Sequence, residues 1–175
     1  MGDFAYKPED IKIDFINVPS TSGRIGMCQC PGIASYNLVE DLRVIKNTGT
    51  VALISLMCDR EYKIYGVSDL SKLIPDGIKH YQLEIIDNGT PDANFESQWK
   101  INGPDIRFLL KQGSTITIHC YAGLGRTGLL TARLLVEFGI SPSRAIKIVR
   151  QARPGAIQNY FQETYLLKRR WEDQY

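Results

Sequence analysis

Apolar and polar residues follow one another in patterns that predict a series of short strands. Five stretches show the alternating or continuous apolar pattern of a strand: residues 11–18, 23–29, 51–57, 78–86 and 116–118. The third stretch is almost wholly apolar, which indicates a strand buried on both faces.

Between these strands, apolar residues recur at helical spacing. The expected helices cover residues 35–46, 70–74, 91–110 and 129–138, a stretch from Pro142 onward, and a last stretch after the turn at 154–158. Thr90 is expected to cap the third helix with Pro91 in its first turn, and Pro104 to kink this helix or divide it in two. The alternation predicts an α/β domain: a central, mostly parallel sheet of about five strands flanked by helices.

The length and composition are those of one globular domain. The chain has 175 residues, of which 43% are hydrophobic and 23% charged, enough to bury a sizeable core. We expect a single domain over residues 1–175, with a frayed start at 1–10 and no signal peptide. The net charge of +2 is too small to favour nucleic acid or a membrane as the main partner. The protein is expected to be a monomer.

The four cysteines do not form the framework of a secreted, disulfide-rich protein in a chain of this length. Cys28 and Cys30 are spaced too closely for a C-x2-C metal motif, and no second pair exists in the sequence. A reducing compartment, the cytoplasm and with it the nucleus, is the expected location.

The candidate chemistry lies in the glycine-rich stretch at residues 119–128. A strand ends in His119 and Cys120, a loop with Gly123 and Gly125 follows, and a helix comes next. Backbone N–H groups of such a loop converge on one point, and the helix N-terminus adds partial positive charge. Arg126 closes the loop, so this stretch is a predicted anion site.

The residue types in this loop indicate cysteine-based phosphate chemistry. Converging N–H donors and a nearby guanidinium stabilise a thiolate, which is the nucleophilic form of Cys120. The planar guanidinium of Arg126 matches two oxygens of a phosphate, and Thr127 can hydrogen-bond the sulfur as it leaves in a second step. A cysteinyl-phosphate mechanism fits these groups, and it requires no metal or organic cofactor.

Two other phosphate-binding loops fit this stretch less well. The residues also spell G-x-G-x-x-G, but a dinucleotide fold needs an acidic residue about 20 positions later, and none lies between Glu137 and Glu163. A Walker A loop would need Gly in place of Cys120 and Lys in place of Arg126. A buried structural cysteine with a solvated Arg126 would explain none of the spacing.

The pattern His-Cys-x5-Arg-Thr-Gly is similar to the signature of the cysteine-dependent protein tyrosine phosphatase superfamily. The chain further resembles the cyclin-dependent-kinase-associated phosphatase branch of the dual-specificity phosphatases, in residues 30–70, 86–92, 119–126 and 155–158. It departs from that branch at Thr127 and Gly128, where Ser-Cys is expected. The resemblance implies a tyrosine-phosphatase-like fold and a protein phosphatase acting on phospho-Tyr and/or phospho-Ser/Thr, with a kinase activation segment, and so a cyclin-dependent kinase, as a candidate substrate.

An acid is also needed, because a phosphate ester cleaves poorly unless its leaving oxygen is protonated. Asp87 follows the strand at 78–86, so it is expected at the same sheet edge as Cys120. On residue patterns alone Asp87 could be an ordinary loop aspartate. The resemblance to the family's acid loop favours Asp87 as the acid, with Asp92 as the alternative, which could instead favour the helix N-terminus.

The resemblance implies further roles in the site. His119 is expected to order the loop, and the alternative is a plain histidine at a strand end. Gln158 is expected to place the hydrolytic water, and the alternative is a polar residue at the start of a helix. The phosphate is expected to be held by Arg126 together with five loop residues: Tyr121, Ala122, Gly123, Leu124 and Gly125.

Two more features of the sequence carry hypotheses. Cys58 ends the strand at 51–57, so a reversible disulfide with Cys120 under oxidation is one expectation and a buried core thiol the other. Peptide mapping after mild peroxide tests this, because overoxidised Cys120 with untouched Cys58 would contradict the disulfide. The basic residues of 142–170, such as Arg150 and Arg153, are expected to form either a solvated face or a docking face for an acidic partner.

Three other functions remain as alternatives. A phosphoinositide phosphatase would want basic residues where Tyr121 and Leu124 stand. An RNA 5'-triphosphate phosphatase would need a broad basic and aromatic surface. A non-catalytic phosphoprotein-binding module would not need nucleophile, arginine and acid together. A phosphoprotein substrate is therefore the expected partner.

Overall fold

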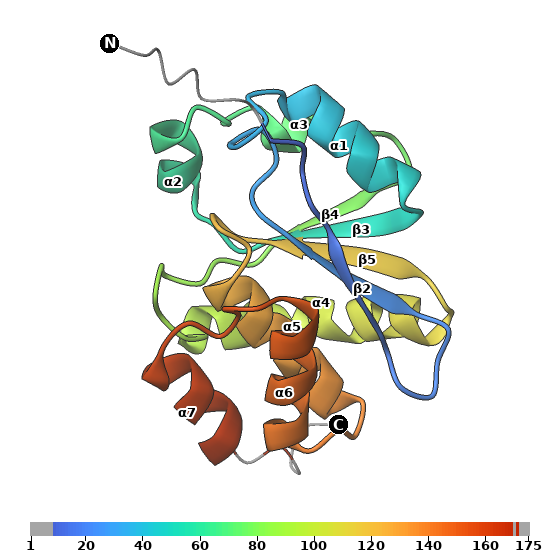
Figure 1. Ribbon diagram of the computed structural model, residues 1–175, viewed down its shortest axis with the longest axis vertical. Helices are drawn as coiled ribbons and strands as arrows, with labels where there is room; N and C mark the ends of the chain where they lie inside the picture. The colour runs from blue at the N-terminus through green and yellow to red at the C-terminus, as the bar shows by residue number, and fades with distance from the viewer. Residues whose placement is uncertain (1–8, 170, 172–175) are drawn as a thin grey trace.

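A five-stranded sheet forms the centre of the computed structural model, which describes residues 9–169 and 171 (Figure 1). Its strands are β1 (Asp14–Asn17), β2 (Arg24–Cys28), β3 (Thr50–Ser55), β4 (Lys79–Gln82) and β5 (Thr115–His119). They lie in the order β1-β2-β5-β3-β4, and only the β1–β2 pair is antiparallel. The predicted fold class is confirmed, whereas residues 1–8 of the predicted frayed start lie outside the described residues.

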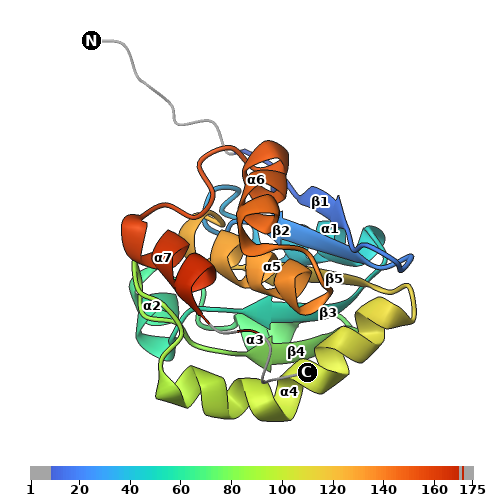
Figure 2. The same ribbon diagram turned by 90° about the horizontal axis from the view of Figure 1, so that it is seen from below.

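Helices cover both faces of the sheet (Figures 1 and 2). One side carries α1 (Leu38–Asn47), α2 (Asp59–Ile64) and α3 (Leu70–Leu73), and the other carries α4 (Ala93–Lys111), α5 (Gly125–Glu137), α6 (Pro142–Ala152) and α7 (Tyr160–Lys168). The central helix α5 packs on β2 and β5 and is covered in turn by α6 and α7. This explains why α5 is buried on all sides from its first turn to Val136.

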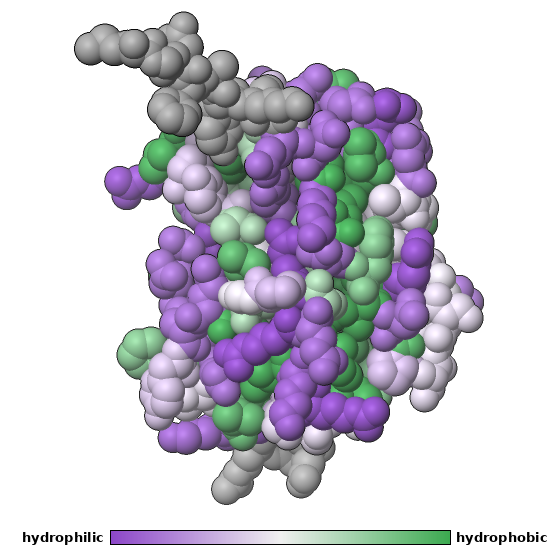
Figure 3. All heavy atoms as spheres, viewed as in Figure 1, coloured by the Kyte–Doolittle hydropathy of each residue, from purple (hydrophilic) through white to green (hydrophobic). Residues whose placement is uncertain are grey.

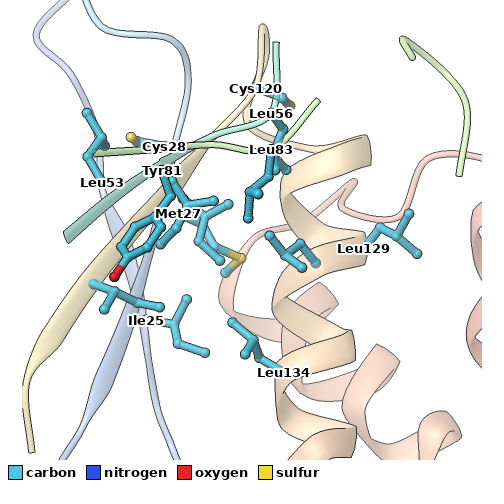
Figure 4. Close-up of a cluster of buried hydrophobic side chains, with 14 of the residues drawn as sticks. Ile25, Met27, Cys28, Leu53, Leu56, Tyr81, Leu83, Cys120, Leu129 and Leu134 are labelled. Atoms are coloured by element: carbon cyan, nitrogen blue, oxygen red, sulfur yellow. The ribbon is translucent and has the colours of Figure 1, made fainter. Parts of the chain in front are cut away.

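The core lies around β5, whose five residues are all buried between β2 and β3. The side chains of this core include Ile25, Met27 and Leu134, and Cys120 lies at the edge of the cluster (Figure 4). Each fully buried side chain of this kind stabilises the fold by about 1.5–3 kcal/mol. The predicted anion site at residues 119–128 therefore follows a strand that is buried along its whole length.

The start of α4 differs from the prediction. Its N-cap is Asp92, whose side chain accepts a hydrogen bond from Phe95 N at 2.8 Å, so the predicted cap at Thr90 and first turn at Pro91 are wrong. A carboxylate is an effective N-cap acceptor and also favours the positive end of the helix. Pro104 lies inside one continuous helix, and Figure 2 shows its axis bending, so the predicted kink is correct and the division into two helices is not.

The surface is predominantly hydrophilic on the face shown in Figure 3, with apolar patches between the polar side chains. None of the helices in the described part of the chain combines the length and the apolar character that a membrane span requires.

Candidate active site

Arg153 holds the outer side of the loop that joins Cys120 to Arg126. From the end of α6, its Nε donates to Gly123 O at 2.6 Å and its Nη2 to Ala122 O at 3.2 Å. Its Nη1 pairs with Asp14 of β1 at 2.7 Å. Both predictions for a basic face are therefore wrong for Arg153, which is buried and anchors the loop to the sheet.

Arg150 is partly exposed, but its guanidinium also binds groups of this chain. Its guanidinium donates to Ala156 O at 3.2 Å and Ile157 O at 3.0 Å, and it pairs with Glu163 at 2.9 Å. It thus fixes the turn at 154–158, which carries Gln158, toward the loop.

The carbonyl groups of this loop accept hydrogen bonds from the surrounding protein, whereas its N–H groups do not donate to it. Tyr121 O accepts from Cys30 N at 3.0 Å, and Leu124 O accepts from Gly128 N at 2.9 Å. Among the described residues, the N–H groups of residues 121–126 donate to no protein acceptor. A cup of free donors therefore lies beside Cys120 at the N-terminus of α5, as the predicted anion site requires.

Gly123 is the position where this curl admits no side chain. Its φ is +70°, and a Cβ there would lie 2.2 Å from Cys28 O. Glycine adopts such a φ without steric penalty. The backbone of β2 thus fits directly against the loop.

Arg126 is directed across the carboxyl edge of the sheet. Its Nη1 and Nη2 bind the two carboxylate oxygens of Glu61 at 2.9 and 2.8 Å, and Nη2 lies 3.0 Å from Oδ1 of Asp87. The side chain is 1% exposed. Its Nε is buried with no hydrogen-bond partner among the described residues, so one donor of the fork remains for a ligand.

Glu61 is the partner of Arg126 that sequence patterns did not reveal. It lies on α2, a short helix absent from the prediction, and Cys58 N donates to its Oε2 at 3.0 Å. Burial raises the pKa of Glu61, but the hydrogen bonds from Arg126 and Cys58 and the charge of Arg126 together outweigh this, so the pKa lies below its ordinary value. The one available cue was a glutamate three residues after a possible N-cap, the spacing of a capping box.

The loop that carries Asp87 is joined to α7. Asp87 is exposed apart from its pairing with Arg126, while Asn159 Nδ2 donates to Asn88 O at 2.9 Å and Gln162 Nε2 to Gly89 O at 3.3 Å. The structure thus brings Asp87 and Arg126 together, as predicted. Asp92 caps α4 instead, although it lines the same cavity of about 230 Å³ as Asp87.

Two glutamines lie against the loop at Gly125. A Cβ built on Gly125 would lie 2.7 Å from Oε1 of Gln158 and 3.0 Å from Nε2 of Gln162. Gln158 N donates to Gln162 Oε1 at 3.0 Å. Gln158 is therefore near the predicted phosphate position. Gln162, which the sequence analysis missed, is buried and links the acid loop to this turn.

His119 is fully buried behind Cys120. Its Nε2 lies 2.6 Å from Oγ of Ser55, and its Nδ1 has no partner of good hydrogen-bond geometry in residues 9–169. Burial lowers the pKa of His119 to about 3, and the Cys120 backbone opposes this shift only in part. The imidazole is therefore neutral at physiological pH. Thr127 Oγ1 is likewise buried without a described partner.

The depressed pKa of His119 predicts a loss of stability in mild acid. An unfolded histidine with a pKa near 6.5 binds a proton that folded His119 refuses until about pH 3, so stability falls as pH drops below about 6.5. His80 contributes in the same direction, because burial also lowers its pKa. We expect the urea midpoint to fall between pH 6.5 and 5.5, above the range in which carboxylates titrate. The His119→Asn variant serves as control, and an equal fall in that variant would assign the effect to other groups.

The remaining cysteines differ in environment. Burial raises the pKa of both Cys28 and Cys30, which keeps these thiols neutral. Cys58 is half-buried at the N-cap of α2, and all four thiols are free. The reversible disulfide between Cys58 and Cys120 stays a prediction. In the described part of the chain, no three His, Cys, Asp or Glu side chains are grouped to hold a metal ion.

Comparison with known proteins places this site in a family. A family model described as cyclin-dependent kinase inhibitor 3 (CDKN3) matches residues 7–146. Cyclin-dependent kinase inhibitor 3 of Rattus norvegicus is 36% identical over 151 residues, which cover 81% of this chain and 69% of the rat protein. Protein tyrosine phosphatase type IVA 3 of Homo sapiens is 34% identical over 132 residues, which cover 75% of this chain and 69% of the human protein.

A solved structure agrees with these relatives. The crystal structure of kinase associated phosphatase, in which the catalytic-site cysteine is replaced by serine, matches 91% of this chain and 94% of its own chain at 30% identity and a TM-score of 0.81. Fold and site together are those of a cysteine-dependent protein phosphatase of the tyrosine and dual-specificity class. The chain belongs to the cyclin-dependent kinase inhibitor 3 family. The predicted resemblance and enzyme class are confirmed.

Proposed function

We propose that this phosphatase hydrolyses phosphorylated Tyr and Ser/Thr side chains of proteins, with Cys120 as the nucleophile. The observation that carries this is the run of backbone N–H groups at residues 121–126, which, like Nε of Arg126, have no hydrogen-bond acceptor among the described residues. Donors fixed in advance around a developing negative charge stabilise the transition state strongly.

The reaction takes two steps on this proposal. The Cys120 thiolate attacks phosphorus while Arg126 and the loop N–H groups hold the three equatorial oxygens, and the bond from phosphorus to the leaving oxygen breaks. Asp87 donates its proton to that oxygen. The incoming phosphate competes with Asp87 for Nη2 of Arg126, which frees the carboxyl group to move to the leaving oxygen.

Water then attacks the cysteinyl-phosphate. Asp87, now ionised, accepts a proton from the water, and Gln158 orients the water against the loop beside Gly125. Thr127 Oγ1 hydrogen-bonds the departing sulfur, for which its buried and otherwise unpartnered hydroxyl is suited. Phosphate leaves, and the thiolate is regenerated.

The rim of the site favours a phosphoprotein over a polyphosphate ligand. The ring of Tyr121 packs on Tyr65 at 4.3 Å between centroids, and Ile86 beside Asp87 is 75% exposed. No basic side chain is present in residues 121–125 to meet additional phosphates. Apolar rim residues suit the side chains that flank a phosphorylated residue in a protein.

A cyclin-dependent kinase is the proposed partner, since relatives carry that kinase in their names. The departure at Thr127 and Gly128 does not alter the surface offered to it, because both residues are buried. A Cβ on Gly128 would lie 2.9 Å from Cβ of Ala156, so this position governs internal packing. We further propose a monomer that works in the cytoplasm and nucleus.

A substrate panel tests the proposed function. The panel contains an aryl phosphate, phospho-Tyr and phospho-Thr peptides including a kinase activation segment, a phosphoinositide and an RNA 5'-triphosphate. We expect turnover of the aryl phosphate and the peptides with kcat/KM highest on a peptide. Higher kcat/KM on the phosphoinositide or the RNA would reassign the substrate class, and binding without turnover would indicate a phosphoprotein-binding module.

The assignment of the acid predicts opposite behaviour for two aspartates. Asp87→Ala is expected to lower kcat by roughly 10²–10³-fold, because the leaving oxygen loses its proton donor. The loss should be largest with a poor leaving group such as a phosphothreonine peptide. Asp92→Ala should keep its turnover and lose about 1 kcal/mol of stability through the lost N-cap. The reverse pattern of kcat values would make Asp92 the acid.

A further inference from the structure

A chain of hydrogen bonds runs from a surface cavity to the residue before Cys120. Oγ of Ser55 lies 2.6 Å from Nε2 of His119 and 2.8 Å from Nε2 of His80. The three residues come from the neighbouring strands β3, β5 and β4, and Ser55 is opposite His119 in the parallel register. Ser55 and His119 are fully buried, so water does not substitute for these bonds.

The single hydroxyl proton of Ser55 couples the two imidazoles. If Ser55 donates to His119, then His80 donates to Ser55 through its Nε2–H, and the proton of His119 is on Nδ1. In the opposite order His119 donates to Ser55 from Nε2, Ser55 donates to Nε2 of His80, and the proton of His80 is on Nδ1. In either order the two neutral rings carry their protons on opposite nitrogens.

His80, at the outer end of this chain of hydrogen bonds, is accessible from the surface. His80 lines a cavity of about 250 Å³ between β4, α2 and α3, together with Asp59, Lys63 and Gln82. Tyr62 forms its inner wall, and its hydroxyl is buried without a hydrogen-bond partner among the described residues. The charged groups facing His80 across this cavity are thus one carboxylate and one ammonium. The charged or titratable groups around His119 and Cys120 are Arg126, Tyr62 and the neutral thiols of Cys28 and Cys30.

We propose that Ser55 and His80 are positioning residues that act on Cys120 through His119. The chain of hydrogen bonds His80–Ser55–His119 holds the His119 ring in one tautomer and one orientation next to Cys120. The strand end that carries the thiolate then stays in register with the donor cup. The inference rests on the proposed nucleophilic role of Cys120, but its two main readouts do not require turnover.

Nitrogen NMR tests the tautomer directly. The chain contains two histidines, so ¹⁵N-histidine labelling gives signals from only two rings, and the His80→Gln variant assigns them. We expect His119 to be neutral from pH 5 to 8, and the two neutral rings to carry their protons on opposite nitrogens, Nδ1 in one ring and Nε2 in the other. Ser55→Ala should convert His119 to a mixture of tautomers. A mixture of tautomers at wild-type His119, or the same tautomer in both rings, would overturn the proposal.

Alkylation of Cys120 by iodoacetate, followed by peptide mass mapping, tests the consequence. His80→Leu is expected to slow alkylation and kcat about fivefold, the effect of one lost hydrogen bond, with KM unchanged. It should also raise the pH midpoint of alkylation. His80→Gln keeps a hydrogen-bonding group at the same reach and should restore the wild-type values. Ser71 lines the same cavity but takes no part in this chain of hydrogen bonds, so Ser71→Ala should not change these values.

The outcomes separate this proposal from the proposed function. Folded His80→Leu with the wild-type alkylation midpoint would overturn the positioning role, even if Ser55→Ala fails to fold. A wild type that shows the expected tautomers and alkylation but hydrolyses no phosphate ester would overturn the proposed function and leave the chain of hydrogen bonds intact.

Discussion

Replacing Cys120 with serine is expected to abolish hydrolysis, with kcat reduced roughly 10⁴-fold or more. A serine hydroxyl is not ionised by the N–H cup at neutral pH, and the histidines are poor bases for it: burial lowers the pKa of His119 to about 3, and His80 is separated from this site by Ser55 and His119. The donors that hold phosphate remain in place, so the variant should still bind a phosphopeptide. Single-turnover hydrolysis and calorimetric binding measure the two effects.

Cys58→Ser is the matched control for this experiment. It makes the same chemical change on a half-buried cysteine, and serine is a favoured N-cap for α2. The control should keep wild-type turnover in reducing buffer. Residual turnover above 1% in Cys120→Ser would contradict covalent catalysis by this thiol, since nucleophile removal leaves only the much smaller effect of binding and electrostatics.

The parts of the site that the sequence predicted are those that are local in the chain. Cys120, Arg126 and the loop glycines lie within one strand–loop–helix unit, so their spacing alone brings them together. Asp87 was placed correctly because parallel strands share their carboxyl edge. The prediction therefore succeeded wherever one unit, or the sheet, determined the geometry.

The missed residues act across elements that only tertiary packing joins. Glu61 reaches Arg126 from a six-residue helix, and Arg153 reaches the loop carbonyls from the end of α6. A basic residue on an amphipathic helix gives no sign of whether it meets solvent or a carbonyl group. For Arg153 the deciding partner is Asp14, 139 positions away in the chain.

Arg133 and Glu137 provide a second example. In the sequence these two charges interrupt an apolar stretch and argue against a membrane span. In the structure both side chains are fully buried, and they pair at 2.8 Å along α5. Arg133 also binds both oxygens of Glu96 on α4, at 2.7 and 3.0 Å, and lies over the ring of Trp99. This ion cluster ties α4 to α5 beneath the sheet.

Arg133→Met is accordingly expected to lower the free energy of unfolding by about 3–5 kcal/mol, because it removes the cation shared by the fully buried carboxylate of Glu137 and the partly buried carboxylate of Glu96. That is a third or more of the roughly 5–15 kcal/mol typical of a domain. Urea unfolding measures it, with Arg169→Met as the control: Arg169 binds the same Glu96 from a partly exposed position, so its loss should destabilise by about 1 kcal/mol. Equal losses in the two variants would show that burial of Arg133 is not the cause.

The pH dependence of the free energy of unfolding gives a second test of this ion cluster. Burial raises the pKa of Glu96, but the hydrogen bond from Arg133 and the charges around it lower the pKa below its ordinary value of 4.5. A carboxyl group with a depressed folded pKa contributes stability that is complete above pH 4.5 and is lost as the pH falls below it. The wild type should therefore lose more stability between pH 5 and 3.5 than Arg133→Met, in which this contribution is already reduced. A steeper loss in the variant would mean that Glu96 owes its low pKa to other groups, and the ion cluster would no longer explain the packing of α4 on α5.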